Sequence, residues 1–317
     1  MKRVFLSMFL VVGLLAAPAF AADYPTKPIT LMTAFNPGGG SDVSHRLLEK
    51  YAKGIFAEPL VVIYKPGAGG EIGWTWLAQA KPDGYTIGGV DLPHIVLQPM
   101  LRPSGQAGYT TNQLSPICNL VYDADVVMVP EKSPWKTFAE FIEHAKANPG
   151  KIKVATVGKL TGDHLFLMQI EKATGAKFTQ VPYPGSGKAI PALQSGEADA
   201  YFGSGSSFLR MENTRGLAIG SPERYELCPD VPTFKELGYD ITSGKYRGIA
   251  SPLNIPKDAR DYLESKFREL CADPEYQKAV KAGGLMPDYR DSAAFAEIIK
   301  NEEARARAIL TEFGLLK

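Results

Sequence analysis

The residues best placed to do chemistry are glycines and their polar neighbours in four short loops. Each loop follows an apolar segment typical of a strand and precedes an amphipathic segment typical of a helix. Glycines let the backbone approach a ligand closely, and the unpaired N–H groups at a helix start favour an anion. The pattern therefore predicts an anion-binding surface made largely of backbone. The four loops span residues 37–42, 67–70, 158–162 and 184–187.

A few polar side chains lie in or beside these loops. His164 falls in the first turn after Gly162 and could donate to an anion, although local capping or packing explains it equally well. Asp42 either favours the positive end of a helix or contacts a ligand, and Arg46 could pair with it one helical turn later. A single glycine loop can be only a tight turn, but four in the same position of a repeated unit favour a ligand site.

Other kinds of site are poorly supported. The 67–73 segment has the wrong spacing for a dinucleotide loop, and the 184–188 segment lacks the Ser or Thr of a phosphate loop. Residues 203–207 do not form a nucleophile elbow. The four histidines have no metal-ligand spacing and no nearby cysteine pair. We therefore expect a binding protein with no cofactor, no metal and no catalytic residue; an enzyme of doubly wound fold is the alternative from another class.

The strand–loop–helix units fall into two sets. The alternation of strands and helices predicts mostly parallel sheets covered by helices. We expect two separate sheets, with the chain crossing between them near Tyr122 and again near Ser243. Helices at 259–272 and 293–313 return the chain to the first set. The expected strands lie at 29–35, 60–64 and 85–90, then at 124–129, 153–157, 178–181, 198–202 and 216–219.

The N-terminal segment predicts export. Lys2 and Arg3, an apolar run at 4–15 and small residues at 17–22 are typical of a cleaved signal peptide, the alternative being an anchor helix. Its removal changes the net charge from +1 to about −1 with no long basic run, which argues against nucleic acid as a partner. The expected organisation is a signal peptide at 1–22, a discontinuous first lobe at 23–122 and 244–317, and a second lobe at 123–243.

The three cysteines are odd in number and far apart in the chain. This spacing gives neither a disulfide framework nor a metal site. Cys271 lies in an expected helix and is interpreted as a small buried hydrophobic residue. A bridge between Cys118 and Cys228 stays open, although nothing in the spacing favours it.

Six ordered segments carry a resemblance that spans essentially the whole chain after residue 22. With these segments the chain resembles the tripartite tricarboxylate transporter substrate-binding family, also called the Bug family of periplasmic receptors. The resemblance implies a type II periplasmic-binding-protein fold of the α/β class, with two α/β lobes joined by two crossover strands. The segments are residues 24–29, 35–42 with Arg46, 65–73, 81–86, 181–185 and 229–233.

The resemblance also implies a function and a site. We expect a monomeric periplasmic receptor that captures a small carboxylate between its lobes, largely by backbone N–H groups, and delivers it to the membrane subunits of a tripartite tricarboxylate-type transporter. A receptor that reports to a sensor kinase is the alternative. The expected ligand-binding residues are Asn36, Gly39, Gly40, Ser41, Asp42, Gly67, Ala68, Gly69, Asp91, Thr161, Gly162, His164, Tyr183, Gly185 and Ser204.

Some positions depart from the commonest family pattern. Asn36 stands where proline is frequent, and residues 159–160 interrupt a loop that is usually rich in Gly and Ser. Residues 204–207 replace a more typical segment with Asp or Asn. These departures leave the identity of the carboxylate open. Arg247, near the second crossing, either faces the cleft or lies on the hinge surface.

Overall fold

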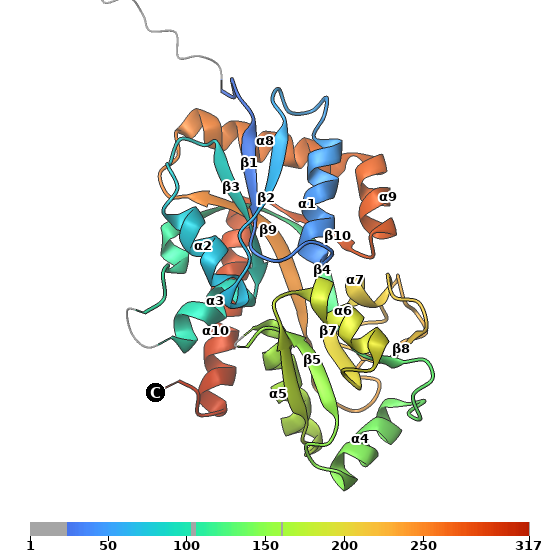
Figure 1. The fold of residues 1–317 in the computed structure, drawn as a ribbon. Coiled ribbons are helices and arrows are strands. Elements are labelled where there is room, and N and C mark those ends of the chain that lie inside the picture. Colours follow the sequence, from blue (N-terminus) through green and yellow to red (C-terminus); the bar gives the residue numbers. More distant parts are fainter. Residues whose placement is uncertain (1–23, 103–105, 160, 317) are drawn as a thin grey trace, which may run out of the picture.

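The computed structural model describes residues 24–102, 106–159 and 161–316. The expected signal peptide at 1–22 lies outside these ranges. Figure 1 shows two α/β lobes, one above the other, joined by long strands that run through both.

The first lobe is built on three parallel strands. β1 pairs with β2 on one side and with β3 on the other. Short runs of apolar residues suit strands that are covered on both faces. The first helix ends before Gly54, because this glycine adopts a φ of 89°, a left-handed conformation that does not continue a helix. The elements are β1 (Ile29–Thr33), α1 (Gly40–Tyr51), β2 (Leu60–Tyr64), η1 (Ala68–Gly70), α2 (Glu71–Ala78), β3 (Thr86–Leu92) and α3 (His94–Leu101).

The second lobe repeats the pattern. β5 pairs in parallel with β6 and with β7. Thr137 and Glu140 form a reciprocal capping box, which fixes the start of the first helix of this lobe. The elements are α4 (Phe138–Ala147), β5 (Lys153–Val157), α5 (Gly162–Thr174), β6 (Thr179–Tyr183), α6 (Ser186–Ser195), β7 (Ala200–Ser204), α7 (Gly205–Phe208) and β8 (Thr214–Ile219).

The long strand β4 (Leu114–Pro130), preceded by η2 (Thr111–Gln113), joins the two lobes. Its first part pairs with β9 (Gly244–Pro252) and its second part with β7 and β8, all antiparallel. The main strand order is β2-β1-β3-β9-β4-β7-β5-β6. The two sheets are therefore not separate as expected but continuous through β4, and the parallel order holds only for the outer strands. The residue boundaries given above for each lobe remain predictions.

The C-terminal segment contains α8 (Lys257–Ala272), α9 (Pro274–Ala282), β10 (Met286–Arg290) and α10 (Ser292–Glu312). β10 pairs with β4, and α10 packs against α3 and β4. At its end α10 reaches the second lobe, where Glu312 forms an ion pair with Lys172 of α5. The C-terminal segment thus contacts both lobes and is not confined to the first, and neither α9 nor β10 was expected from the sequence.

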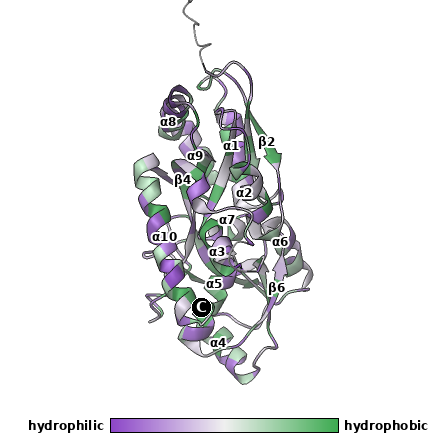
Figure 2. Ribbon diagram, turned by 90° about the vertical axis from the view of Figure 1, so that its left-hand side faces the viewer, coloured by the Kyte–Doolittle hydropathy of each residue, from purple (hydrophilic) through white to green (hydrophobic). Residues whose placement is uncertain are grey.

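Buried apolar side chains form the cores on both sides of the continuous sheet. Along α8 and α10, hydrophilic and hydrophobic residues alternate (Figure 2), which is typical of helices with one buried face. On α8 the buried face includes Leu263 and Phe267. All three cysteines are free and buried, so the Cys118–Cys228 bridge does not form. In the described part of the chain, every helix falls short of the length and apolarity needed to cross a membrane.

Candidate functional site

The four predicted glycine loops meet in pairs where the lobes join. The loop before α1 faces the loop before α6, so closely that a Cβ atom added at Gly187 would lie 2.2 Å from the carbonyl oxygen of Pro37. The loop before α2 faces the loop before α5, where a Cβ atom added at Gly158 would lie 3.5 Å from Cα of Gly69. Backbones come this close only where side chains are missing. The glycines therefore form the contact between the lobes.

Helix starts from both lobes surround the same space. α1 and α6 begin after Gly39 and Gly185, which offer no side chain to cap the first turn. The first N–H groups of a helix have no partner within the helix, and the helix dipole favours negative charge beside them. Gly40 of α1 and Ser186 of α6 line one cavity. Donors from both lobes therefore lie around that cavity.

Arg247 on β9 hydrogen-bonds to residues of both lobes beneath this cavity. Its Nη1 donates to Oγ of Ser41 at 2.8 Å and to the carboxylate of Asp91, while its Nη2 donates to Asp123 at 2.8 Å. Asp123 also accepts from the backbone and hydroxyl of Ser206 in α7, at 2.9 and 2.6 Å. Burial alone lowers the pKa of Arg247, but the charges of Asp91 and Asp123 outweigh it and raise that pKa. The guanidinium thus stays charged while linking both lobes.

Lys245 makes the matching connection two residues earlier, on the same face of β9. Its ammonium pairs with Asp125 and lies 2.9 Å from a carboxylate oxygen of Asp163 at the start of α5. Burial raises the pKa of Asp163, and the charge of Lys245 opposes that rise only in part. Although the junction holds several acids, the described residues contain no group of three His, Cys, Asp or Glu arranged to hold a metal ion.

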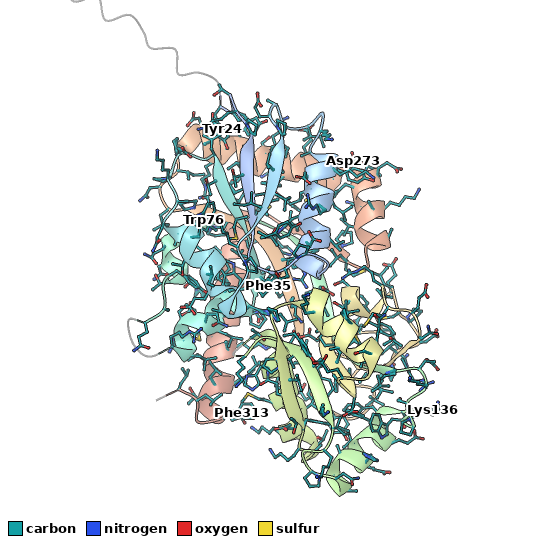
Figure 3. The ribbon with its side chains drawn as sticks, in the orientation of Figure 1. Tyr24, Phe35, Trp76, Lys136, Asp273 and Phe313 are labelled. Atoms are coloured by element: carbon teal, nitrogen blue, oxygen red, sulfur yellow. The ribbon has the colours of Figure 1, made fainter. Side chains whose placement is uncertain are left out.

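The cavity beside Arg247 is small. Its volume of about 20 Å³ is close to the room that one water molecule needs. Phe35, which lines it, lies where the two lobes meet (Figure 3). Burial lowers the pKa of His94 well below its usual value, and the charges of Lys245 and Arg247 lower it further, so the ring is neutral near pH 7. The lining residues are Phe35, Gly39, Gly40, Ser41, Asp91, His94, Val157, Ser186, Lys245 and Arg247.

Two buried polar atoms on this lining lack a hydrogen-bond partner within the described ranges. They are Nε of Arg247 and Nδ1 of His94. Buried polar groups in folded proteins are almost always paired, so each unpaired one calls for an explanation. Both atoms belong to side chains that face the cavity, and a bound molecule there would complete their hydrogen bonds.

Many of the residues predicted for the site come together at this junction. Gly39, Gly40, Ser41 and Asp91 line the cavity itself. The remaining contacts lie between the loops: Gly185 packs against Asn36, Gly162 against His94, and Gly69 against the methyl group of Thr161. Gly67 and Ala68 belong to the same loop as Gly69, and all three have positive φ.

Asp42, Ser204, His164 and Tyr183 also lie off the cavity lining, and their side chains make other contacts. Asp42 accepts from the N–H of Gly38 and the hydroxyl of Tyr64, and it pairs with Arg46 at 3.6 Å as expected. The Ser204 hydroxyl bonds those of two serines in α7, at 3.2 and 3.0 Å. These two side chains therefore support the loops around the cavity.

His164 and Tyr183 are the other two predicted site residues whose side chains make contacts elsewhere. The hydroxyl of Tyr183 donates to Glu197 at 2.7 Å, and burial together with this bond raises the pKa of Tyr183 to about 12. His164 lines an apolar crevice with Leu97 of α3 and Leu310 of α10. Burial lowers the pKa of His164. Their assignment as ligand contacts stays a prediction.

Sequence reasoning missed His94, Lys245 and Ser186 and left Arg247 open. One signal was available. Asp123 and Asp125 alternate with apolar residues in β4, and Lys245 and Arg247 alternate in β9. Because residues two apart share a face of a strand, opposite charges in two apolar strands indicate that the strands pair. In the structure Asp123 lies opposite Lys245 in the antiparallel register.

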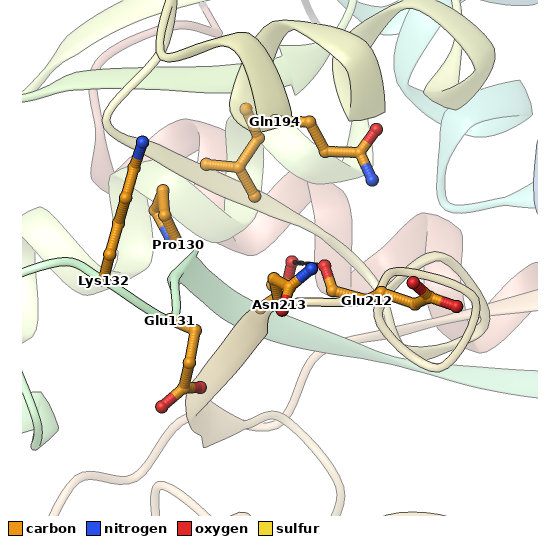
Figure 4. Close-up of a pocket in the computed structure, with 8 residues that line it drawn as sticks. Pro130, Glu131, Lys132, Gln194, Glu212 and Asn213 are labelled. Atoms are coloured by element: carbon orange, nitrogen blue, oxygen red, sulfur yellow. Dashed lines mark hydrogen bonds between the residues drawn. The ribbon is translucent and has the colours of Figure 1, made fainter.

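A larger surface groove of about 540 Å³ lies elsewhere, at the ends of β4 and α6 and at the start of β8 (Figure 4). Its polar side chains are those of Glu131, Lys132, Gln194, Glu212, Asn213 and Thr214. None of the predicted site residues lines it. Size alone therefore does not mark this groove as the ligand site.

Comparison with known proteins places the chain among periplasmic receptors. A family described as tripartite tricarboxylate transporter family receptor matches residues 44–315. A protein of Cupriavidus necator described as "UPF0065 protein in gbd 5'region" is 31% identical over 316 residues, covering 96% of this chain and 94% of that protein. The structure of periplasmic binding protein BugD is similar with a TM-score of 0.85 and 26% identity, over 93% of this chain and 100% of BugD.

Two ligand-bound structures share the fold at lower identity. One is an R. palustris protein with adipate, at a TM-score of 0.87 and 21% identity over 92% of this chain and 99% of that chain. The other is MatC from Rhodopseudomonas palustris with bound malate, at 0.84 and 22% over 90% of this chain and 100% of that chain. BugD is a periplasmic binding protein and the matched family is one of receptors, which agrees with the binding protein expected from the sequence. Because the match covers most of its length, the chain belongs to the tripartite tricarboxylate transporter receptor family.

Proposed function

We propose that this protein is a periplasmic receptor that captures a small di- or tricarboxylate between its lobes and delivers it to the membrane subunits of a tripartite tricarboxylate-type transporter. One observation carries the proposal. Helix starts from both lobes line a single cavity that also holds an unpaired guanidinium nitrogen. Such a set of donors suits a carboxylate, because backbone N–H groups at helix starts and arginine N–H groups bind anionic oxygens.

The small cavity supports a mechanism of opening and closing. A pocket for a small organic ligand usually measures several hundred Å³, far more than the about 20 Å³ found here. The lobes must therefore separate for a ligand to enter, with bending at β4 and β9, and close around it less tightly than in this structure. A ligand that contacts both lobes binds the closed form better and shifts the population toward it. The membrane subunits would then recognise this closed form.

The relatives support the ligand class and the partner. Malate and adipate, bound in two proteins of the same fold, both carry two carboxylates. The family description names a transporter receptor, which supports delivery to membrane subunits. Residues 1–22 have the pattern of a cleaved signal peptide, which supports a periplasmic location.

Titration calorimetry tests the ligand class. Malate, adipate and citrate serve as probes, with glucose as a neutral control. We expect saturable binding of at least one acid and none of glucose. Binding of glucose alone, or of none of the four, would contradict the proposal.

Delivery and location need cellular measurements. We expect the protein in the osmotic-shock fraction with its first residues removed. We also expect deletion of its gene to abolish uptake of the radiolabelled acid at low concentration. Normal uptake in the deletion strain would contradict the transport role while leaving ligand binding intact.

A further inference from the structure

Resting on the function proposed above, we infer that Arg247 is the specificity-determining residue of the cleft, with its Nε–H donating to one carboxylate of the ligand and His94 completing the contact. The two residues come from strand β9 and from the start of α3, both in contact with the first-lobe loop before α1. This carboxylate of the ligand would lie between these side chains and the first turn of α1.

The hydrogen-bond count of Arg247 leaves two N–H bonds unused, the second one of Nη2 and the one on Nε. A guanidinium carries five N–H bonds. Both hydrogens of Nη1 are used by Ser41 and Asp91, and Nη2 donates to Asp123, whereas Nε has no partner in the described chain. The residue is only 5% exposed, so bulk water does not satisfy that hydrogen. Of the side chain that lines the cavity, Nε is therefore the nitrogen without any partner in the described chain.

The aspartates around Arg247 determine how its guanidinium can bind a ligand. Asp91 and Asp123 neutralise the guanidinium charge and hold its plane in place. The cavity therefore presents a positioned hydrogen bond and not a free positive charge. A positioned donor loses little entropy on binding, so it contributes more to selectivity than a mobile side chain would.

Gly40, in the first turn of α1, lies close to the guanidinium of Arg247 and limits its movement. A Cβ atom added at Gly40 would lie 2.6 Å from Nη2 of Arg247. No other residue type fits there without displacing the arginine. The loop that supplies backbone donors and the arginine that supplies the side-chain donor are thus held at a fixed separation.

His94 adds a second unpaired atom on the same lining. Its ring is neutral for the reasons given above, so one ring nitrogen donates and the other accepts. Nδ1 is buried without a partner among the described residues, and Gly162 of the second lobe packs against this ring. Closure of the second lobe therefore seals the side of the cavity on which His94 lies.

The test separates hydrogen bonding from charge with Arg247→Lys. Lysine keeps the positive charge for Asp91 and Asp123 but cannot reproduce the planar set of donors. The probes are whichever of malate, adipate and citrate binds wild type most tightly, and the monoamides of that acid. We expect wild type to prefer the acid over one monoamide by about tenfold, because a hydrogen bond to a charged carboxylate is stronger than one to the neutral carbonyl oxygen of an amide. Arg247→Lys should lose most of that preference.

Arg215→Lys is the matched control. Arg215 lies on β8 and pairs with Glu131, away from the cavity, so its replacement should leave the preference unchanged. Retention of the full wild-type preference in a folded Arg247→Lys protein would overturn the inference and leave Arg247 as a hinge residue only. Failure of wild type to bind any of the three acids would instead contradict the proposed function, and the inference with it.

A second measurement decides the matter if Arg247→Lys does not fold. The Nε–H resonance of Arg247 in ¹⁵N-labelled wild type should shift when the acid is added, because a new acceptor reaches it. His94→Phe, which keeps an aromatic ring, should weaken binding about tenfold or more. An unmoved Nε–H resonance at saturation would overturn the inference.

Discussion

At the residue scale, the buried histidine beneath the first ligand loop ties stability to pH. His45 on α1 is only 2% exposed, and its Nδ1 lies 2.7 Å from Oγ1 of Thr33. Burial lowers the pKa of His45 to about 4, although the charge of Asp91 opposes this and that of Arg247 adds to it. The folded protein therefore keeps this ring neutral at pH values where the unfolded chain takes up a proton.

We predict that acid destabilises the protein through this histidine. Between pH 6.5 and pH 4 the unfolded chain binds the extra proton, so the free energy of unfolding falls as the pH falls. The histidine contributes about 1.4 kcal/mol per pH unit, or about 3 kcal/mol over that window. Urea unfolding of wild type and His45→Gln at several pH values measures this pH dependence of the free energy of unfolding.

The His45→Gln protein should have a shallower pH dependence, with the difference confined to that window. His94 has a lowered pKa as well, so some dependence should remain in the variant. If the free energy of unfolding varied in parallel with pH for the two proteins from pH 4 to 7, His45 would not be the titrating group.

At the element scale, the contact between the loops before α1 and α6 controls closure. Gly187 lies in the first turn of α6, where alanine is a better helix former than glycine. Its added methyl group, however, would meet the carbonyl oxygen of Pro37 across the lobes. Gly187→Ala should therefore leave the second lobe at least as stable while preventing full closure. We expect at least tenfold weaker binding in calorimetry, with no fall in melting temperature.

Lys188→Ala is the control for that variant, since it changes the next residue in the same turn and its side chain is exposed. It should bind within about twofold of wild type, because exposed charges are largely screened. Equal affinities for Gly187→Ala and wild type would show that the two loops need not meet for binding.

The elements around the ligand loops were predictable because they depend on local signals. The strand–glycine loop–helix units appear in the structure with small shifts, and Thr137 with Glu140 marks the start of α4 as a capping box. The Asp273–Pro274 pair that begins α9 is also a local signal, but it was not used. β10 was missed because its Met-Pro-Asp-Tyr-Arg sequence lacks the apolar alternation of a strand.

The ion-pair partners of the buried cations beside the cavity could not be predicted in the same way. The partners of Arg247 lie 124 to 206 residues away in the chain. Sequence position does not say which acid a buried cation will meet, since that depends on how β4 and β9 align. The loops themselves were therefore predictable from local sequence, whereas the side chains that join the lobes were not.

At the scale of the whole molecule, we predict a change of shape on binding. The described chain has its lobes closed on a cavity too small for an organic acid. Without ligand, the protein in solution should populate a more open form, and addition of a bound acid should lower the radius of gyration. Small-angle scattering with and without the acid measures this. A radius that stays constant at saturation, for a protein that binds the acid, would exclude closure as the response.

The main chain forms much of the contact between the lobes and side chains form the cavity wall, and this separation affects how such receptors diversify. The lobes touch through glycine backbone, while the cavity wall facing a ligand includes the side chains of Phe35, His94 and Ser186. Substitutions at those three positions change the cavity while leaving the glycines of the contacting loops in place. Gene duplicates could therefore acquire new substrates through few mutations and still close in the same way. Directed evolution of a biosensor from this scaffold should begin at the same three positions.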